Sequence, residues 1–341
     1  MFSIHDILKK YKEDKGKFQG KQTQGSPELK RAPQENKISV SFVMSKAAET
    51  VSDAKARELY EEALSYARKA YRPDLGYAAD FIEGINAEVK KIINFLNTDN
   101  RELLKLCFAD YPELKDYLYF HAVNVCIIAV YIGSGFDYER QDLIELGTAA
   151  LLHDIGIIRH LDIININGPL GKKEYELIKE HPQAGIEILN KVSKETLSQK
   201  ILDAVCQEHE RIDGSGYPCG LKGAGISEYA QIIGLVDVYE AMLHQRPYRR
   251  KYSPFETITV ILGDKNAFRH SIIKVLIDKI GIFPVGTPVH LSTKEVAVVI
   301  KDNPGFPLRP VVNIFLDANG KRLSETKEVD LVGNAVIYIE G

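Results

Sequence analysis

The sequence has little net charge, few cysteines and no long hydrophobic run. Its 341 residues include 44 Lys and Arg against 47 Asp and Glu, so it lacks the basic excess of a protein that binds nucleic acid through bulk charge. No segment approaches the roughly 18 apolar residues of a membrane helix, and the first residues contain no apolar core with a cleavage site. We therefore predict a cytoplasmic protein that binds no DNA and has no transmembrane segment.

The cysteines exclude two further classes of protein. There are four of them, and none forms a C-x-x-C pair. This pattern excludes a disulfide framework and a structural zinc site built on cysteine. Apolar residues make up 45% of the chain and charged residues 27%, the composition of an ordinary globular protein.

The pattern along the chain predicts a mainly α protein with four parts. Residues 1–38 carry nine basic and five acidic residues and little to bury, which predicts a flexible basic arm. Residues 39–110 show helical periodicity and form a helical N-terminal segment, and 111–282 form a larger helical domain. Short β-branched segments separated by turn signals predict a small β-rich C-terminal subdomain over 283–341. The helices near 50–96 either pair with a second copy in a homodimer or pack on the chain's own bundle.

Histidines and aspartates recur within the apolar helical segments of the larger domain. A single histidine on such a helix is usually a core residue, but a buried carboxylate is costly unless it is paired or binds a metal. Apart from the adjacent pair His153 and Asp154, successive members are 27 to 32 residues apart, which suits one helix and one connection each. Imidazole and carboxylate ligands together suit iron, manganese or zinc. The members of the series are His121, His153, Asp154, His181, His209 and Asp237.

The adjacent pair His153 and Asp154 suits a two-metal site. A carboxylate can bridge two metals, and metals about 3.5–4 Å apart lower the pKa of a bridging water and hold a phosphate for in-line attack. The chain therefore has the residues of a phosphate ester hydrolase, with His153 and Asp154 as the candidate catalytic residues.

Two further segments suit contacts with a ligand. The loop from Asp213 to Pro218, DGSGYP, combines glycines and a proline around Tyr217, which gives a rigid turn whose backbone a ligand can approach. By itself it is equally compatible with a plain turn. Arg246 and Arg249 lie in the segment RPYR, where two guanidinium groups suit phosphate oxygens, although a solvated helix end is an equal alternative.

Together these motifs resemble the HD-GYP family, bacterial phosphodiesterases that act on the second messenger cyclic di-GMP. HDIG, HPQAG, HERIDGSGYP, VDVYEAM and RPYR occur in the family's order and spacing over roughly residues 115–255. The resemblance implies an HD-domain helical bundle, so that 111–282 is an HD-GYP metal-dependent phosphohydrolase domain. It also implies two or sometimes three metals, commonly iron or manganese, and signalling partners such as GGDEF-type proteins at the GYP loop.

The resemblance assigns a role to each matching position. The implied ligands of one metal are His121, His153, Asp154 and Asp237, and those of the second are Asp154, His181 and His209. The implied substrate-binding residues are Asp213, Gly216, Tyr217 and Pro218, with Tyr217 near the guanine bases, and Arg246 and Arg249 on the phosphates.

Three positions depart from the family's pattern. Glu208 stands where the family usually has a histidine, and it can still ligate a metal through oxygen. Ile157 replaces a lysine, which removes a cationic phosphate contact worth about 1.5–3 kcal/mol. Tyr117 replaces the glutamate that holds a third metal in some members, so two metals are expected.

These departures leave three hypotheses open. The first is a phosphodiesterase in which a metal-bridging hydroxide opens cyclic di-GMP to pGpG and/or GMP. The second is a catalytically impaired protein that acts as a cyclic di-GMP sensor or interaction module, as Ile157 and Glu208 suggest. The third is an HD hydrolase of another nucleotide, against which the GYP loop argues.

Overall fold

A computed structural model describes most of the chain from residue 51 onward. The basic arm predicted over 1–38 lies outside the described residues, as do Arg246 and Arg249. The described ranges are 51–72, 80–98, 101–112, 116–164, 171–193, 197–245, 251–264, 266–303 and 305–340.

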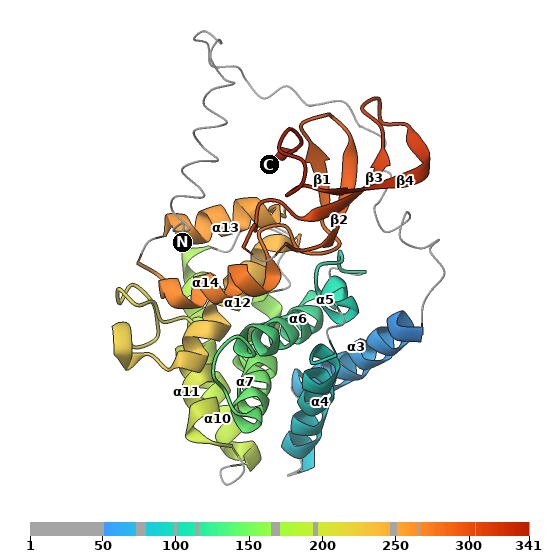
Figure 1. Cartoon of the computed structure of the whole chain (residues 1–341). Coiled ribbons are helices and arrows are strands. Elements are labelled where there is room, and N and C mark those ends of the chain that lie inside the picture. Colours follow the sequence, from blue (N-terminus) through green and yellow to red (C-terminus); the bar gives the residue numbers. More distant parts are fainter. Residues whose placement is uncertain are drawn as a thin grey trace. The chain divides into compact units, whose positions relative to one another are not determined.

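The larger part of the described chain is a bundle of helices (Figure 1). Helix α4 shows why these segments are helical, because its apolar residues recur every three or four positions and are the buried ones. The elements are α3 (Val51–Ala70), α4 (Asp80–Leu96), α5 (Glu102–Cys107), α6 (Tyr117–Gly133), α7 (Arg140–Leu152), the 3-10 helix η2 (Ile155–His160), α8 (Leu161–Ile164), α9 (Lys172–Ile178), α10 (His181–Ser193), α11 (Gln199–Gln207), the 3-10 helix η3 (Gly223–Gly225), α12 (Glu228–Leu243), α13 (Pro254–Gly263) and α14 (His270–Ile280).

Helix α6 is the centre of this bundle. It is apolar on all sides and almost wholly buried, as expected of a helix surrounded by others. It packs against α3, α4, α5, α7, α12 and α14. Polar side chains on α6 therefore face the protein interior, where each needs a partner. His121 and Asn124 are buried in this way.

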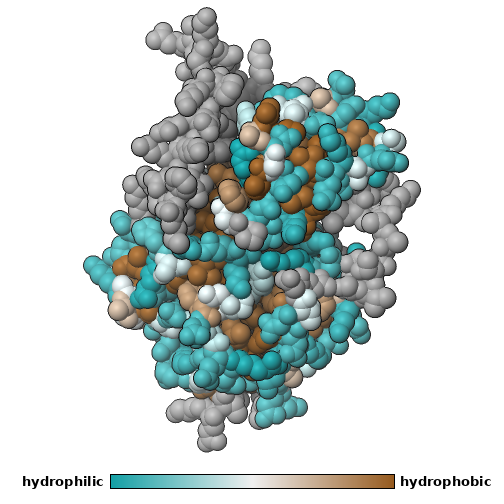
Figure 2. Space-filling view, in the orientation of Figure 1, coloured by the Kyte–Doolittle hydropathy of each residue, from teal (hydrophilic) through white to brown (hydrophobic). Residues whose placement is uncertain are grey.

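The C-terminal part is a five-stranded antiparallel sheet with the order β4-β3-β2-β1-β5 (Figure 1). Buried and exposed residues alternate along β1 and β2, so one face of the sheet is covered. Figure 2 shows hydrophobic residues at the surface over this part of the chain. The strands are β1 (Pro288–Leu291), β2 (Val296–Lys301), β3 (Val311–Leu316), β4 (Arg322–Asp330) and β5 (Ile339–Glu340).

The predicted fold class, a mainly α protein with a small β-rich C-terminal tail, is confirmed. One strand differs from the expectation. The strand β4 has the polar sequence RLSETKEVD, so the β-branched pattern that predicts the C-terminal subdomain does not mark it. It lies at the edge of the sheet and is mostly exposed, a position in which polar residues are usual.

The domain boundaries stay predictions. Within the described residues, no helix has the length and apolar character to cross a membrane.

Candidate metal centre

Six secondary-structure segments bring the predicted ligands to one place inside the bundle. His121 lies on α6, and His153 and Asp154 occupy the junction between α7 and η2. His181 begins α10, Glu208 and His209 follow α11, and Asp237 lies in the middle of α12. Side chains from the ends or the interior of successive helices are therefore brought together, although they lie as far apart in sequence as His121 and Asp237.

The first group of ligand atoms contains His121, His153 and Asp237. Their candidate ligand atoms all lie within 4.8 Å of one another. The Nε2 atom of His121 is 3.1 Å from Oδ1 of Asp237. Burial alone would raise the pKa of the Asp237 carboxyl, but its hydrogen bond with His121 and the nearby imidazoles lower that pKa below its ordinary value. The carboxylate of Asp237 is therefore ionised.

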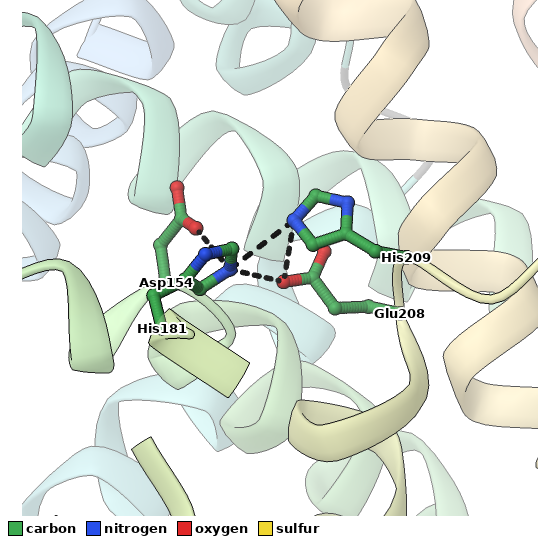
Figure 3. Close-up of side chains that lie close together, drawn as sticks. All are labelled: Asp154, His181, Glu208 and His209. Atoms are coloured by element: carbon green, nitrogen blue, oxygen red, sulfur yellow. Dashed lines mark hydrogen bonds and ion pairs between the residues drawn. The ribbon is translucent and has the colours of Figure 1, made fainter. Parts of the chain in front are cut away.

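The second group contains Asp154, His181, Glu208 and His209, again within 4.8 Å (Figure 3). His181 lies between the others, with Nε2 3.2 Å from Oδ1 of Asp154 and 3.1 Å from Nε2 of His209. Oε1 of Glu208 is 3.4 Å from the Nε2 atoms of both histidines. Glu208, which replaces the family's histidine, is thus positioned to supply an oxygen ligand in its place.

Asp154 connects the two groups. Its Oδ1 faces His181, whereas its Oδ2 is 3.5 Å from Nε2 of His153 and 3.9 Å from Nε2 of His121. Burial favours the neutral acid, but the imidazoles of these three histidines outweigh it and lower the pKa of Asp154. An ionised carboxylate with one oxygen toward each group has the arrangement required to bridge two cations.

Hydrogen bonds to the backbone orient two of the histidines. Nδ1 of His153 donates to the carbonyl of Ala150 at 2.8 Å, and Nδ1 of His181 donates to the carbonyl of Ile178 at 2.7 Å. Each bond directs Nε2 toward the cluster, as for metal-binding imidazoles. Nε2 of His153 is buried and has no hydrogen-bond partner among the described residues, and the same holds for Oε2 of Glu208.

The contact between His181 and His209 indicates what the cluster is built to hold. Burial lowers the pKa of His209. For His181, burial is outweighed by Glu208 and Asp154, which raise its pKa to about 9. His181 is therefore protonated, and its Nε2 faces the carboxylates of Asp154 and Glu208 as well as Nε2 of His209. Two buried atoms without hydrogen-bond partners, Nε2 of His153 and Oε2 of Glu208, and a protonated imidazole between carboxylates fit a site for divalent cations.

Glu240 completes the site, although it was not among the predicted residues. It is fully buried on α12, and its Oε2 accepts a hydrogen bond from Nδ1 of His121. Burial would raise the pKa of Glu240, but His244 and His121 hold it well below the ordinary value. The spacing of three residues from Asp237 contained the signal, because residues at i and i+3 share one face of a helix.

The loop from Asp213 to Pro218 places Tyr217 on the metal centre. The Tyr217 ring stacks on His209, with centroids 4.6 Å apart. Glu210 holds the loop by accepting hydrogen bonds from the backbone N–H groups of Cys219 and Leu221. The side chain of Asp213 instead accepts a hydrogen bond from the backbone N–H of its own loop at Ser215. The structure therefore brings Tyr217 to the cluster, while substrate contacts by Asp213, Gly216 and Pro218 stay predictions.

A lysine that the sequence reasoning did not single out lies beside Tyr217. The Lys179 ammonium is 5.9 Å from the centroid of the Tyr217 ring and pairs with Glu176 at 3.0 Å. Ile157, where the family has its lysine, is buried in η2. Among the residues that the structure describes, Lys179 thus places a positive charge beside the Tyr217 ring. Its position two residues before His181 is the sequence feature that could have identified it.

Gly156 allows η2 to approach the start of α10. A Cβ at this position would lie 1.9 Å from the carbonyl oxygen of His181 and 2.6 Å from the backbone nitrogen of Gly185. No side chain fits in this space. The contact fixes the distance between Asp154, which precedes η2, and His181, which begins α10.

Two profiles of known domain families match the sequence of the chain. The profile of the HD domain matches residues 83–269, more than half of the chain, and contains all the clustered ligands. The chain belongs to the HD-domain family. The profile of a KOW domain associated with the HD domain matches residues 288–341. This range contains the strands of the C-terminal sheet.

Curated relatives share this HD domain. A cyclic di-GMP phosphodiesterase of Pseudomonas aeruginosa is 32% identical over 78% of this chain and 62% of its own length. A cyclic di-GMP phosphodiesterase of Borreliella burgdorferi is 28% identical over 64% of this chain and 57% of its own. A 3′3′-cGAMP-specific phosphodiesterase of Vibrio cholerae is 34% identical over 37% of this chain and 28% of its own. This HD-domain chain thus spans about 60% of the first two relatives.

A solved structure shares the fold. An HD-GYP-type protein from Bdellovibrio bacteriovorus superposes with a TM-score of 0.56, covering 70% of this chain and 76% of its own, at 17% identity. At this level of identity the likeness concerns the fold alone. The HD-domain bundle implied by the sequence motifs is therefore confirmed.

Proposed function

We propose that this HD-domain protein is a metal-dependent phosphodiesterase that hydrolyses cyclic di-GMP. The observation that carries the proposal is the position of Asp154, whose two oxygens face two separate groups of imidazole and carboxylate ligands. The names of the Pseudomonas and Borreliella relatives support the choice of substrate.

The proposed cofactors are two divalent ions, iron or manganese. One would be held by His121, His153 and Asp237 and the other by His181, Glu208 and His209, with Asp154 shared between them. When bound, such ions lower the pKa of a coordinated water and neutralise charge on the phosphate. The mixture of nitrogen and oxygen donors fits both metals, and no cysteine belongs to either group.

The protein's own residues would orient the water and the substrate. The ionised Asp154 would accept a hydrogen bond from the attacking water, while His153, whose Nδ1 is bound to the carbonyl of Ala150, would offer the lone pair of its Nε2 to a metal. The water oxygen forms a bond to phosphorus and the bond from phosphorus to the ribose 3′-oxygen breaks. A proton of the water ends on this leaving oxygen as a hydroxyl group, and the ring is opened to linear pGpG. A second cleavage gives GMP. Tyr217 offers a ring face beside the site for a guanine base.

Phosphate binding would fall to cationic side chains. Lys179 lies beside Tyr217, and a lysine binds phosphate oxygens as a point charge. Arg246 and Arg249 remain proposed phosphate contacts. Docking of GGDEF-type partners on the GYP loop, and homodimerisation through the helices near 50–96, also remain proposals.

Two alternatives have specific support. The relative specific for 3′3′-cGAMP suggests another cyclic dinucleotide as the substrate. Glu208 in the cluster and the buried Ile157 support a protein that binds cyclic di-GMP with little turnover, because both change the charge around the phosphate.

The test is metal content and turnover on the same protein. The chain is purified without oxygen and loaded with Fe(II) or Mn(II), and cyclic di-GMP and 3′3′-cGAMP are each followed by chromatography. Two metals per chain and faster cleavage of cyclic di-GMP are expected, with Asp154→Asn inactive. Faster cleavage of 3′3′-cGAMP would overturn the assigned substrate. Two metals without turnover, with activity gained in a Glu208→His, Ile157→Lys variant, would favour the sensor.

A further inference from the structure

Donors from several parts of the bundle surround the carboxylate of Glu240. Its Oε1 accepts hydrogen bonds from the Tyr111 hydroxyl and from Nδ2 of Asn124 at 2.8 Å. Nδ1 of His244 lies 3.0 Å from the same oxygen and donates to the backbone carbonyl of Glu240. Its Oε2 accepts from Nδ1 of His121. Three side-chain donors, from Tyr111, Asn124 and His121, therefore bind the two oxygens from different segments, and the side chain needs one orientation to accept from all of them.

This arrangement determines which nitrogen of His121 faces the metal centre. An acceptor at Nδ1 requires the proton to be there, which leaves the lone pair on Nε2 directed at Asp237 and the cluster. The pairing of a carboxylate with the distal nitrogen of a metal-binding histidine raises the basicity of the ligand and fixes the plane of its ring.

The hydrogen bonds continue from Glu240 to helix α3. Asn124 is fully buried on α6, and its Oδ1 accepts from the Tyr60 hydroxyl at 2.6 Å. Tyr60 belongs to α3, which precedes the region matched by the HD-domain profile. A continuous chain of side-chain hydrogen bonds therefore joins Tyr60, Asn124, Glu240 and His121.

We propose that Tyr60, Asn124 and Glu240 form a relay of positioning residues through which helix α3 holds the His121 imidazole in its metal-binding orientation. The HD domain would then require α3 for full metal affinity at the His121 site. The inference rests on the metal occupancy that the proposed function assumes, but it does not depend on which nucleotide is cleaved.

Two substitutions test the two ends of the relay. Glu240→Gln keeps the shape but presents an amide N–H₂ to donors, so either His121 or Asn124 must reverse its hydrogen bond. Tyr60→Phe removes one hydroxyl and leaves the ring. The matched control is Tyr71→Phe, because the buried Tyr71 hydroxyl also bonds the bundle, at the carbonyl of Leu151, but takes no part in the relay.

The measurements are Mn(II) affinity by titration calorimetry, the tautomer of His121 by nitrogen-15 NMR, and thermal stability of the metal-free protein. Glu240→Gln is expected to weaken one of the two Mn(II) sites roughly 10- to 100-fold and to shift His121 toward the Nε2–H form. Tyr60→Phe is expected to weaken the same site by about threefold or more, a smaller effect because Tyr60 acts through two intermediates. Tyr71→Phe is expected to leave the affinity within twofold of the unmodified chain.

Two results would overturn the relay. Unchanged Mn(II) affinity and tautomer in folded Glu240→Gln would remove Glu240 as a positioning residue. Equal stability losses in Tyr60→Phe and Tyr71→Phe with equal, unchanged affinities would reduce Tyr60 to a packing residue. Failure of the proposed function looks different, because the unmodified protein would bind Mn(II) tightly with the relay effects present and still not cleave cyclic di-GMP.

Discussion

The Nε2 atoms of His181 and His209 lie 3.1 Å apart across the candidate metal centre. The carboxylates of Glu208 and Asp154 raise the pKa of His181 to about 9, so His181 is protonated in the metal-free protein, whereas burial lowers the pKa of His209. Both nitrogens point at a common space that Asp154 and Glu208 also face. A divalent cation in this space would replace the proton and satisfy both imidazoles at once.

Metal binding is therefore expected to stabilise the fold. A cation at about one hundred times its dissociation constant adds about 2.7 kcal/mol to the free energy of unfolding, which should raise the melting temperature by several degrees. Thermal unfolding with Mn(II) and with a chelator measures the difference. His181→Ala should lose much of this shift, while the exposed His270→Ala should keep it. Equal shifts in both variants would contradict the assignment of His181.

Much of the candidate metal centre could be predicted from the sequence. The candidate ligands His121, Asp154 and Asp237 interrupt apolar helical segments, where a buried charge requires a partner. That requirement is independent of tertiary detail, so the pattern identified the cluster before the helices were placed. The helical class followed in the same way from apolar periodicity.

Other features depend on packing that no local pattern contains. In the sequence, Glu240 is one more polar residue of a helical segment. The fold places Tyr111 and Asn124 as hydrogen-bond donors to its carboxylate and the His244 imidazole 3.0 Å from it. Strand β4 pairs with β3 through its backbone, and its polar side chains carry no periodic signal. Both features arise from contacts between segments far apart in the sequence.

Because η2 and α10 approach closely at Gly156, a single added methyl group there is expected to lower both the stability and the metal affinity of the protein. Gly156→Ala would place Cβ 1.9 Å from the carbonyl oxygen of His181, so η2 and α10 must separate. We expect a loss of at least about 2 kcal/mol of stability, comparable to overpacking in a core, together with weaker Mn(II) binding. Chemical denaturation and calorimetry measure the two effects.

The control for that substitution is Gly263→Ala. Gly263 ends α13, and a Cβ there would meet nothing within 4 Å. Alanine favours a helix over glycine by up to about 1 kcal/mol, so this variant should be neutral or slightly more stable. If Gly156→Ala behaved like Gly263→Ala, η2 and α10 would not be held together as the structure shows.

Glu208 is expected to set the preference among metals. Carboxylate oxygen favours manganese, whereas imidazole suits iron and zinc. Glu208→His should therefore bind Mn(II) more weakly relative to Fe(II) than the unmodified chain does, because its second cluster would gain a nitrogen ligand and lose one negative charge. Anaerobic competition between the two ions, followed by metal analysis, gives the ratio. An unchanged ratio would show that Glu208 does not ligate the metal.

Lys179 is expected to contribute to substrate binding rather than to the chemical step. Its ammonium lies beside the Tyr217 ring, at the edge of the cluster where a dinucleotide phosphate would enter. The substitution Lys179→Ala removes one charged contact of about 1.5 kcal/mol. It should therefore raise KM for cyclic di-GMP roughly tenfold and leave kcat nearly unchanged. Initial rates at two salt concentrations measure this, since a lost ionic contact also reduces the salt dependence.

A matched pair of variants separates this role from a general loss of positive charge. Lys173→Ala removes an exposed lysine from α9, the helix that ends next to Lys179, and should leave KM within twofold. Lys179→Arg should restore most of the affinity, because the charge remains although its shape differs. A fall in kcat with unchanged KM in Lys179→Ala would instead assign Lys179 to the chemical step, and equal effects of Lys173→Ala and Lys179→Ala would reduce both to long-range attraction of the substrate.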